Sequence, residues 1–331
     1  MRAIAVDHPG GRERLRLIEA PVPAPVAGEA LISVAYAAAN WGDVQKRQGI
    51  YPDPVEYPAI LGAEVSGIVT AVGPDVRRLK IGARVAAICG PKMLGGYADY
   101  VALPAAYLLP LPAAIPLKTA ATLPVATLTA YHLLHTAHGI RRGEVILVHA
   151  VAGAVGLALA QIASLAGATV IGTVGDGAKV RVPRRYGAAR VIDRSSEDFV
   201  AAAMKFTNGR GVDLVIDSLG GDILPRSFDA LCPYGRVINI GEAAGEPDFP
   251  VRKKLYERST SLAGFELLHA LPGSRTWRRG VNKVISLAAS GRLKMPIAGI
   301  YPLVDCNYLH EAFERRGTVG KLLLEVDRSL R

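Results

Sequence analysis

Residues 145–166 constrain the fold most, because an apolar run, a turn of small residues and a helix-forming run follow one another there. Residues 145–149 predict a buried strand, the next seven are only Ala, Val and Gly, and an Ala- and Leu-rich run begins at Leu157. In dinucleotide-binding domains this order places a pyrophosphate against the first turn of the helix, where free N–H groups and the helix dipole favour anions. We expect the turn to be formed by Gly153, Ala154, Val155 and Gly156.

The next predicted strand, residues 169–174, indicates which dinucleotide is bound. An NAD site usually places Asp or Glu at the tip of this strand, to hold the ribose 2′-hydroxyl. Here the strand ends in Thr173 and Val174, with no carboxylate at the tip, and we expect Thr173 to bind the cofactor. Lys179 and Arg194 follow, and both could reach a 2′-phosphate. NADPH is therefore favoured, although Asp176 points towards NAD and the two cations could be ordinary surface charges.

The remainder of the chain predicts an α/β protein with a β-rich part. Short β-branched runs with Gly and Pro between them come first, and a helix is expected over 120–138. Strands and helices then alternate as in a doubly wound parallel sheet, with a strand-like tail at 321–326 that we expect to return to the first domain. The strands expected in the sheet are 144–149, 169–174, 190–193, 214–217, 235–240 and 261–265.

Composition excludes some classes of protein. A length of 331 residues suggests two domains, no apolar stretch is long enough to cross a bilayer, and the N-terminal apolar run is too short for a secretory signal. We therefore expect a soluble, cytoplasmic protein. None of its three cysteines forms a CxxC motif with another, so the sequence predicts no disulfide framework. The net charge of +10 leaves RNA binding as an alternative, but the basic residues form scattered pairs rather than a dense tail.

Several further motifs occur in an order that resembles one protein family. The chain resembles the zinc-free quinone oxidoreductase (zeta-crystallin-like) branch of the medium-chain dehydrogenase/reductase superfamily over nearly its whole length. The motifs that carry the resemblance are Asn40-Trp41-Gly42-Asp43, Leu61-Gly62-Ala63-Glu64, Gly95-Gly96-Tyr97-Ala98, Thr127-Leu128-Thr129-Ala130-Tyr131, the 149–156 turn, Asp217-Ser218-Leu219-Gly220-Gly221 and Gly320-Lys321.

The resemblance implies a GroES-like catalytic domain from residues 1–118 and 267–331, a Rossmann NADPH-binding domain from 119–266, and a cofactor cleft where they meet. Zinc-dependent relatives take metal ligands from a Cys and a Gly-His-Glu segment, whose positions resemble Asn40 and Gly62-Ala63-Glu64 here. The ligating thiolate and imidazole are both replaced, so we expect no catalytic metal.

The family's site residues carry over to matching positions of this chain. Asn40, Tyr51 and Thr129 resemble residues at the nicotinamide end, and Asn40 and Tyr51 are the candidates for catalysis. Lys179, Arg194 and Arg316 resemble the phosphate-side cations, while Ile240, Gly241 and Phe265 fall where later strands meet the nicotinamide. Gln45 stands where bacterial members often have a tyrosine, which leaves the substrate class open.

The resulting hypothesis is a zinc-independent, NADPH-dependent oxidoreductase that reduces a quinone by hydride transfer. An enoyl or enone double-bond reductase is the alternative within the enzymes, and an RNA-binding or structural protein that retains NADPH affinity is the alternative outside them. We also expect a homodimer through the strand at 261–265, because an unpaired apolar edge tends to find a partner.

Overall fold

The computed structural model describes residues 1–330 and divides the chain into two compact units. The first unit combines residues 1–128 with the chain from Leu271 onward, and the second consists of residues 129–270. The predicted domain boundaries, after residues 118 and 266, lie ten and four residues before the divisions at 128 and 270, and they stay predictions. Each unit is described by itself below.

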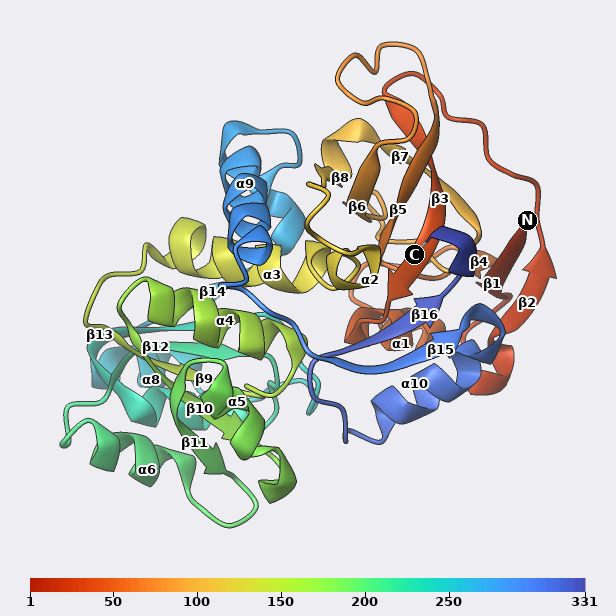
Figure 1. The fold of residues 1–331 in the computed structure, drawn as a ribbon. Helices are drawn as coiled ribbons and strands as arrows, with labels where there is room; N and C mark the ends of the chain where they lie inside the picture. Colours follow the sequence, from red (N-terminus) through yellow and green to blue (C-terminus); the bar gives the residue numbers. More distant parts are fainter. Residues whose placement is uncertain (331) are drawn as a thin grey trace. The chain divides into compact units, whose positions relative to one another are not determined.

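The second unit is built on a six-stranded sheet in the order β11-β10-β9-β12-β13-β14, with every neighbouring pair parallel (Figure 1). This is the doubly wound Rossmann arrangement predicted from the sequence. Its strands are rich in buried Val, Ile and Leu because helices cover a parallel sheet. The strands are β9 (Val145–Val148), β10 (Thr169–Val174), β11 (Ala188–Asp193), β12 (Val212–Asp217), β13 (Leu231–Asn239) and β14 (Ser261–Gly264).

Helices connect these strands, and most are short. The longest, α4, follows the small-residue turn and buries Leu157, Leu159 and Ile162. Phe199 and Ala203 of α6 join the same core as Leu147 and Ile171 of the sheet. The helices are α4 (Ala154–Leu165), α5 (Arg181–Arg185), α6 (Phe199–Phe206), α7 (Ile223–Ser227) and α8 (Val251–Glu257).

The single helix expected over 120–138 is wrong. The structure has α2 (Leu117–Ala120), then α3 (Pro124–His132), which continues as a π-helical turn over Leu133–His138. Pro124 lacks the N–H that would continue a helix from the preceding turn, and it suits a first helical position. The apolar period alone could not separate these segments, because both are rich in small and apolar residues.

The first unit contains a seven-stranded sheet in which β15-β16-β3-β5-β6-β8 are neighbours and β7 also pairs with β3, and a three-stranded sheet β2-β1-β4. The tail strand β16 pairs antiparallel with β3, as expected, so the last strand joins one of the first. The strands are β1 (Arg2–Val6), β2 (Arg16–Glu19), β3 (Glu29–Ala38), β4 (Ala59–Ile60), β5 (Glu64–Val72), β6 (Arg84–Ile88), β7 (Tyr100–Pro104), β8 (Leu108–Pro110), β15 (Ile297–Pro302) and β16 (Lys321–Glu325); the remaining helices are α1 (Trp41–Gln48), α9 (Arg275–Ala289) and α10 (Cys306–Glu314).

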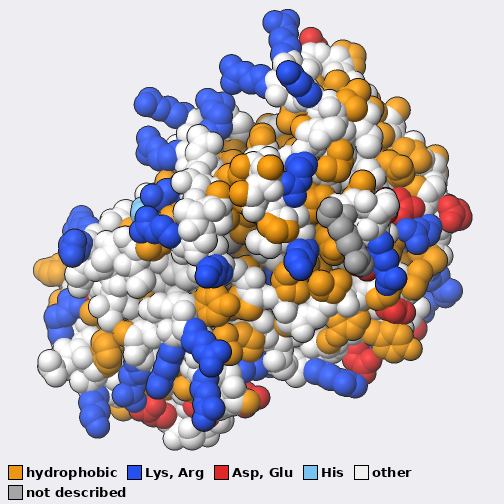
Figure 2. Space-filling model, viewed as in Figure 1, with side chains coloured by type: hydrophobic (Ala, Val, Ile, Leu, Met, Phe, Trp, Pro, Cys, Tyr) orange, Lys and Arg blue, Asp and Glu red, His pale blue; other side chains and the backbone are white. Residues whose placement is uncertain are grey.

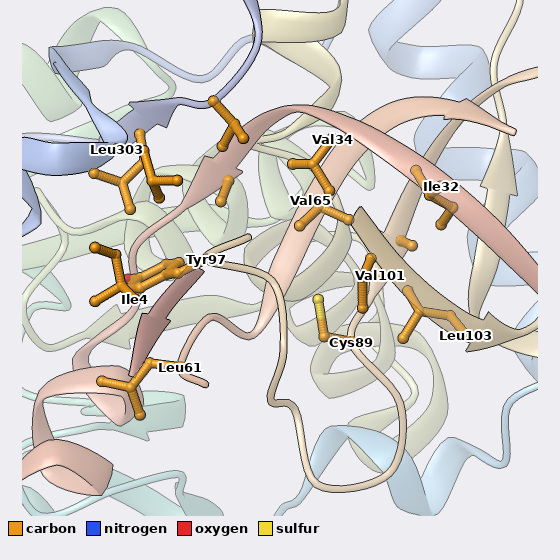
Figure 3. Packing of buried hydrophobic residues seen from close by; sticks show 14 of the residues in the cluster. Ile4, Ile32, Val34, Leu61, Val65, Cys89, Tyr97, Val101, Leu103 and Leu303 are labelled. Atoms are coloured by element: carbon orange, nitrogen blue, oxygen red, sulfur yellow. The ribbon is translucent and has the colours of Figure 1, made fainter. Parts of the chain in front are cut away.

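One apolar cluster forms the main core of the first unit. Val34 on β3 and Val65 on β5 face a common interior with Ile4 on β1 (Figure 3). Tyr97 is fully buried in the same cluster and donates its hydroxyl to Asp43 Oδ2 at 3.2 Å. The cluster also takes Leu303 and Leu309 from the C-terminal part of the chain, so both chain ends contribute to one core.

Lys and Arg side chains lie in separate groups on the face shown in Figure 2. None of the helices formed by residues 1–330 has the length and apolar character needed to span a membrane. The cytoplasmic location stays a prediction.

We predict that the two glycines of the small-residue turn differ in their tolerance of a methyl group. A Cβ at Gly156 would lie 2.5 Å from Val151 Cα and 2.7 Å from its carbonyl oxygen, whereas a Cβ at Gly153 would meet only Ala150 O, at 3.3 Å. Gly156→Ala should therefore lower the free energy of unfolding by about 1–3 kcal/mol. The matched Gly153→Ala should cost less than about 1 kcal/mol. Urea unfolding measures both, and equal losses would contradict the packing argument.

Candidate functional site

The second unit has a topological switch point between β9 and β12. From β9 the chain proceeds to β10 and β11 on one side, and then returns to β12 on the other. Open parallel sheets bind ligands outside the carboxyl ends of the strands at such a point. The two strands remain paired up to this end, where the His149 N–H donates to Ile216 O at 3.0 Å.

The predicted turn lies directly after β9 at this switch point. Ala150 has a left-handed backbone with φ of 49°, and its carbonyl accepts the Gly153 N–H at 2.9 Å. Gly153 is the N-cap of α4, so Ala154, Val155 and Gly156 form the first helical turn. The N–H groups of a first turn have no acceptor within their own helix. The structure thus places the four predicted residues at the N-terminus of α4, where backbone N–H groups can bind an anion.

His149, the residue just before this turn, has a buried side chain with two hydrogen-bond contacts. Its ring is 2% exposed, Nε2 lies 3.0 Å from Ser227 Oγ, and Nδ1 lies 2.9 Å from Thr173 Oγ1. Because Ser227 donates its hydroxyl to Ile223 O, it accepts from the ring, so Nε2 carries the proton and Nδ1 accepts from Thr173. Burial, aided by the charge of Arg194, lowers the pKa of His149 to about 3. The ring is a neutral structural group at physiological pH.

The predicted role of Thr173 therefore needs a correction. It was expected at the cofactor, but its side chain is fully buried and its hydroxyl is used by His149. The β10 position that points into the core cannot also offer its side chain outward, since side chains alternate along a strand. We remove its side chain from the proposed cofactor site.

Arg194 follows β11 and has an unusual environment. Its Nε is buried without a hydrogen-bond partner, and no ion pair among residues 1–330 includes it. Burial lowers the pKa of this guanidinium, while Asp217 and Asp193 act in the opposite direction. Its side chain lines a cavity of about 320 Å³ with Ser196, Phe199 and Arg226 among others. A partly buried cation with an unmet donor, beside a strand tip, is suited to an anionic ligand.

The other charged groups at this edge are more exposed. Lys179 is half-buried at the end of a short 3-10 turn, Gly177–Lys179. Asp176, which pointed towards NAD, is exposed and accepts the Ala178 N–H at 2.9 Å, so its carboxylate caps that turn. The signal for NAD thus has a local structural explanation.

The carboxyl ends of β13 and β14 hold three more predicted residues. The Ile240 N–H donates to Asp217 O at 2.8 Å, and the Phe265 N–H donates to Asn239 O at 3.1 Å. Gly241 O accepts from Asn239 Nδ2 at 2.9 Å. These bonds bring Ile240, Gly241 and Phe265 to the same sheet edge as the small-residue turn, with Asp217 and Asn239 as an unpredicted polar support.

In the first unit, Asn40 lies in a hydrogen-bonded cluster with Glu64 and Lys321. Lys321 Nζ donates to Asn40 Oδ1 at 2.6 Å and forms an ion pair with Glu64 Oε1. Asn40 Nδ2 donates to Glu64 Oε1 at 3.0 Å. Glu64 is fully buried and Lys321 is 1% exposed, whereas Asn40 is partly exposed. The three residues meet because β16, β3 and β5 are neighbours.

Tyr51, Arg316 and Thr129 are the other residues that the sequence predicted for the nicotinamide end or the phosphate side. Tyr51 packs against α1, where a Cβ on Gly42 would lie 3.1 Å from its ring, and Lys46 Nζ is 4.6 Å from the ring centroid. Arg316 is exposed just after α10 with a left-handed φ of 55°. Thr129 is buried on α3, and the division between the units falls just before it.

The residues at the positions of the relatives' zinc ligands do not fit zinc. Asn40 and Ala63 offer neither thiolate nor imidazole, and the ammonium of Lys321 already contacts both the Asn40 oxygen and Glu64. Among residues 1–330 no group of three or more His, Cys, Asp or Glu side chains is arranged to hold a metal ion. A zinc ion at Asn40 would be repelled by the ammonium of Lys321, which contacts the same amide oxygen.

Sequence reasoning missed Glu64 and Lys321 as members of the site. A signal was present, because each is a charged residue at the start of a strand whose following residues are mostly apolar. Charged residues are almost never fully buried unless paired, so two such residues of opposite sign suggest one buried pair. The pairing partner could not be found without the strand order.

Two protein-family models and several known proteins match the sequence of this chain. The family model of the alcohol dehydrogenase GroES-like domain matches residues 26–113, and that of the zinc-binding dehydrogenase matches residues 154–286. A probable quinone oxidoreductase of Schizosaccharomyces pombe is 34% identical over 322 residues, covering 97% of this chain and 96% of that protein. The chain belongs to the quinone oxidoreductase branch of the medium-chain dehydrogenase/reductase superfamily. The resemblance found in the sequence is confirmed.

Solved structures of the superfamily agree with this assignment. The crystal structure of Escherichia coli quinone oxidoreductase complexed with NADPH superposes with a TM-score of 0.93 at 33% identity, covering 98% of this chain and all of that one. A 2-haloacrylate reductase of a Burkholderia species is 32% identical over 330 residues, covering 97% of this chain and 98% of that protein. The GroES-like and Rossmann fold classes expected from the sequence are confirmed.

We predict that His149 makes folding sensitive to acid. Its pKa is about 3 in the folded protein against about 6.5 when unfolded, so between these values the unfolded chain binds more protons. Stability is complete above pH 6.5 and falls as the pH is lowered, by about 2 kcal/mol at pH 5 from this group.

Urea unfolding at pH 7.5 and pH 5 tests this prediction. His149→Gln should reduce the loss of stability between the two pH values, whatever its effect on stability at pH 7.5. His269→Gln is the matched control, because His269 is exposed and should leave the difference unchanged. An unaltered pH dependence in His149→Gln would contradict the buried neutral ring.

Proposed function

We propose that this chain is an NADPH-dependent oxidoreductase that passes hydride to a conjugated acceptor, with a quinone as the leading candidate. The observation that carries the proposal is the small-residue turn at the switch point of a six-stranded Rossmann sheet. Membership of the quinone oxidoreductase branch supports it. In this proposal Ala154, Val155 and Gly156 bind the pyrophosphate through backbone N–H groups, and Gly153, which has no side chain, lets the backbone approach it.

Arg194 is the main support for NADPH over NADH. Its partly buried guanidinium lines a cavity and forms no ion pair among residues 1–330, so its terminal N–H groups would gain charge-assisted hydrogen bonds from a 2′-phosphate. Lys179 of the second unit is proposed to add to the positive potential at the same phosphate. Ile240, Gly241, Phe265 and Thr129 of the second unit are proposed to line the nicotinamide end. The roles that the family resemblance gives to Asn40, Tyr51 and Arg316 stay predictions.

The proposed reaction needs no metal. NADPH, when bound, supplies the hydride, and a proton from solvent completes the reduction of a quinone to a hydroquinone. The residues at the relatives' zinc positions lack zinc donors, so carbonyl polarisation would come from hydrogen bonds. Tyr51 and ordered water are the candidate donors.

An enone or enoyl double-bond reductase is the second candidate. It is favoured by the absence of an aromatic ring at Gln45, which would otherwise stack on a quinone, and by the similarity to a 2-haloacrylate reductase, whose name denotes an α,β-unsaturated acid. Both reactions deliver hydride to a conjugated system, so the same nucleotide site serves either.

Nucleotide titration followed by acceptor turnover tests the proposal. Nicotinamide fluorescence should show tighter binding of NADPH than NADH, and the complex should then be oxidised by a quinone or an enone. Activity should survive dialysis against a chelator, with zinc far below one equivalent per chain. Binding of neither nucleotide would refute the proposal, and near-stoichiometric zinc required for turnover would refute its metal-free form.

Substitution of Arg194 tests the choice of nucleotide. Arg194→Gln should weaken NADPH binding by about 10- to 100-fold, the worth of a hydrogen bond to a charged group, and change NADH binding by less than about threefold. Arg184→Gln, on the exposed side of α5, is the matched control and should leave both affinities unchanged. Equal losses for NADPH and NADH would mean that Arg194 does not contact the 2′-phosphate.

We also propose a homodimer through β14. This strand lies at the edge of the six-stranded sheet, and its residues Ser261–Ala263 are only partly buried within one chain. An open edge with apolar side chains can be completed by its two-fold copy. Light scattering at micromolar concentration should give about twice the chain mass of 35.0 kDa, and a single-chain mass would refute the dimer.

A further inference from the structure

The second unit has a cavity at the edge of its six-stranded sheet that lies opposite the small-residue turn. The cavity measures about 560 Å³, and the turns before β9 and β12 form it at the amino ends of these two strands. Because β9 and β12 are parallel, their amino ends lie at one edge of the sheet and their carboxyl ends at the other. The nucleotide is proposed to bind at the carboxyl ends, so this cavity is not part of that site.

Three arginines line this cavity, and two of them have no acidic partner. Arg210 donates through Nη1 and Nη2 to the two carboxylate oxygens of Asp213, both at 2.7 Å. Arg141 and Arg142 are exposed, and among residues 1–330 neither side chain forms an ion pair. Each guanidinium has five N–H donors and no acceptor, so these two side chains can bind an anion.

The two carboxylates that line the cavity already have donors within the protein. Asp213 Oδ2 accepts the Val145 N–H at 2.8 Å in addition to Arg210. Glu144 Oε2 accepts the Arg141 backbone N–H at 2.9 Å and lies 3.1 Å from His138 Nε2. Three arginines against these two carboxylates give the lining side chains a net charge of +1.

The backbone around the cavity holds the arginines in place. The Gly143 N–H donates to Gly167 O at 2.9 Å, which joins the turn before β9 to the end of α4. The stem of Arg142 lies over Gly167, where an added Cβ would be only 2.9 Å from Arg142 Cγ. Arg210 is fixed by its two bonds to Asp213. Groups that are held before a ligand arrives lose less conformational entropy when it binds.

We propose that this cavity binds a phosphorylated small molecule through Arg141 and Arg142, with Arg210 as a third, fixed cation. A guanidinium pairs with phosphate through two parallel N–H bonds, so two unpaired arginines beside one cavity favour a phosphate group. The volume lies within the range of about 300–1,000 Å³ that is usual for small-ligand sites. Strands of nucleic acid stack on aromatic side chains, and none of the residues among 1–330 that line the cavity is aromatic. The site is independent of the proposed reaction.

Titration calorimetry with inorganic pyrophosphate, in the presence of saturating NADPH, tests the site. NADPH is included because the small-residue turn could otherwise bind the same probe. Arg141→Gln and Arg142→Gln should each weaken pyrophosphate binding about 3- to 10-fold, since each removes charge-assisted hydrogen bonds at an exposed position. Arg184→Gln, exposed on α5, is the matched control and should bind as the wild type does. All three side chains are exposed, so Tm should stay unchanged.

Protection from phenylglyoxal, which modifies guanidinium groups, locates the bound probe. Pyrophosphate should slow the modification of Arg141 and Arg142 in peptide maps and leave that of Arg184 unchanged. Equal modification rates with and without pyrophosphate would contradict binding at this cavity.

The remaining outcomes separate this site from the proposed function. Pyrophosphate that does not bind the wild type, or that binds the Arg141→Gln/Arg142→Gln double variant equally well, would refute the site. Tighter binding of a single-stranded RNA than of pyrophosphate, lost in the same double variant, would overturn the small-molecule ligand. A wild type that binds no NADPH would refute the proposed function alone, because the two arginine substitutions would still report on pyrophosphate at this cavity.

Discussion

The buried ion pair between Glu64 and Lys321 is the interaction on which the first unit depends most. It joins the first residue of β5 to the first residue of β16, on either side of β3. Two charges that are almost wholly buried require each other, because removing one partner of such a pair typically costs about 3–5 kcal/mol. Their cost is offset by further hydrogen bonds from Val125 and Asn40, so no lone charge remains in the core.

This pair also links the fold to the site. Asn40 lies two residues after the end of β3 and is the N-cap of α1. Its backbone N–H donates to Asp43 Oδ2 at 2.8 Å, and its side chain is hydrogen-bonded to both members of the ion pair. A small change in the register of β16 would therefore move the Asn40 side chain. The second unit shows a similar arrangement, in which the buried ring of His149, the residue just before the small-residue turn, connects β10 with α7.

Local patterns predicted the second unit well because its features are continuous in the chain. An apolar strand, a turn without large side chains and a helix are adjacent in residues 145–166, and parallel strands covered by helices are apolar along their whole length. The error over 120–138 arose where periodicity is uninformative, and Thr173 was misplaced because only the sheet shows which face a strand residue occupies.

The sequence by itself determined the Rossmann turn, the absence of a carboxylate at the tip of β10 and the loss of the relatives' zinc ligands, since each depends on residues that are neighbours in the chain. Only the tertiary structure decided that Lys321 meets Glu64 and Asn40, because these side chains are 257 and 281 positions apart and come together through antiparallel pairing. The tertiary structure likewise decided that Arg194 Nε has no hydrogen-bond partner and that the Asp176 carboxylate caps a turn. Which donors remain available depends on which hydrogen bonds have formed, and the long-range hydrogen bonds exist only in the folded chain.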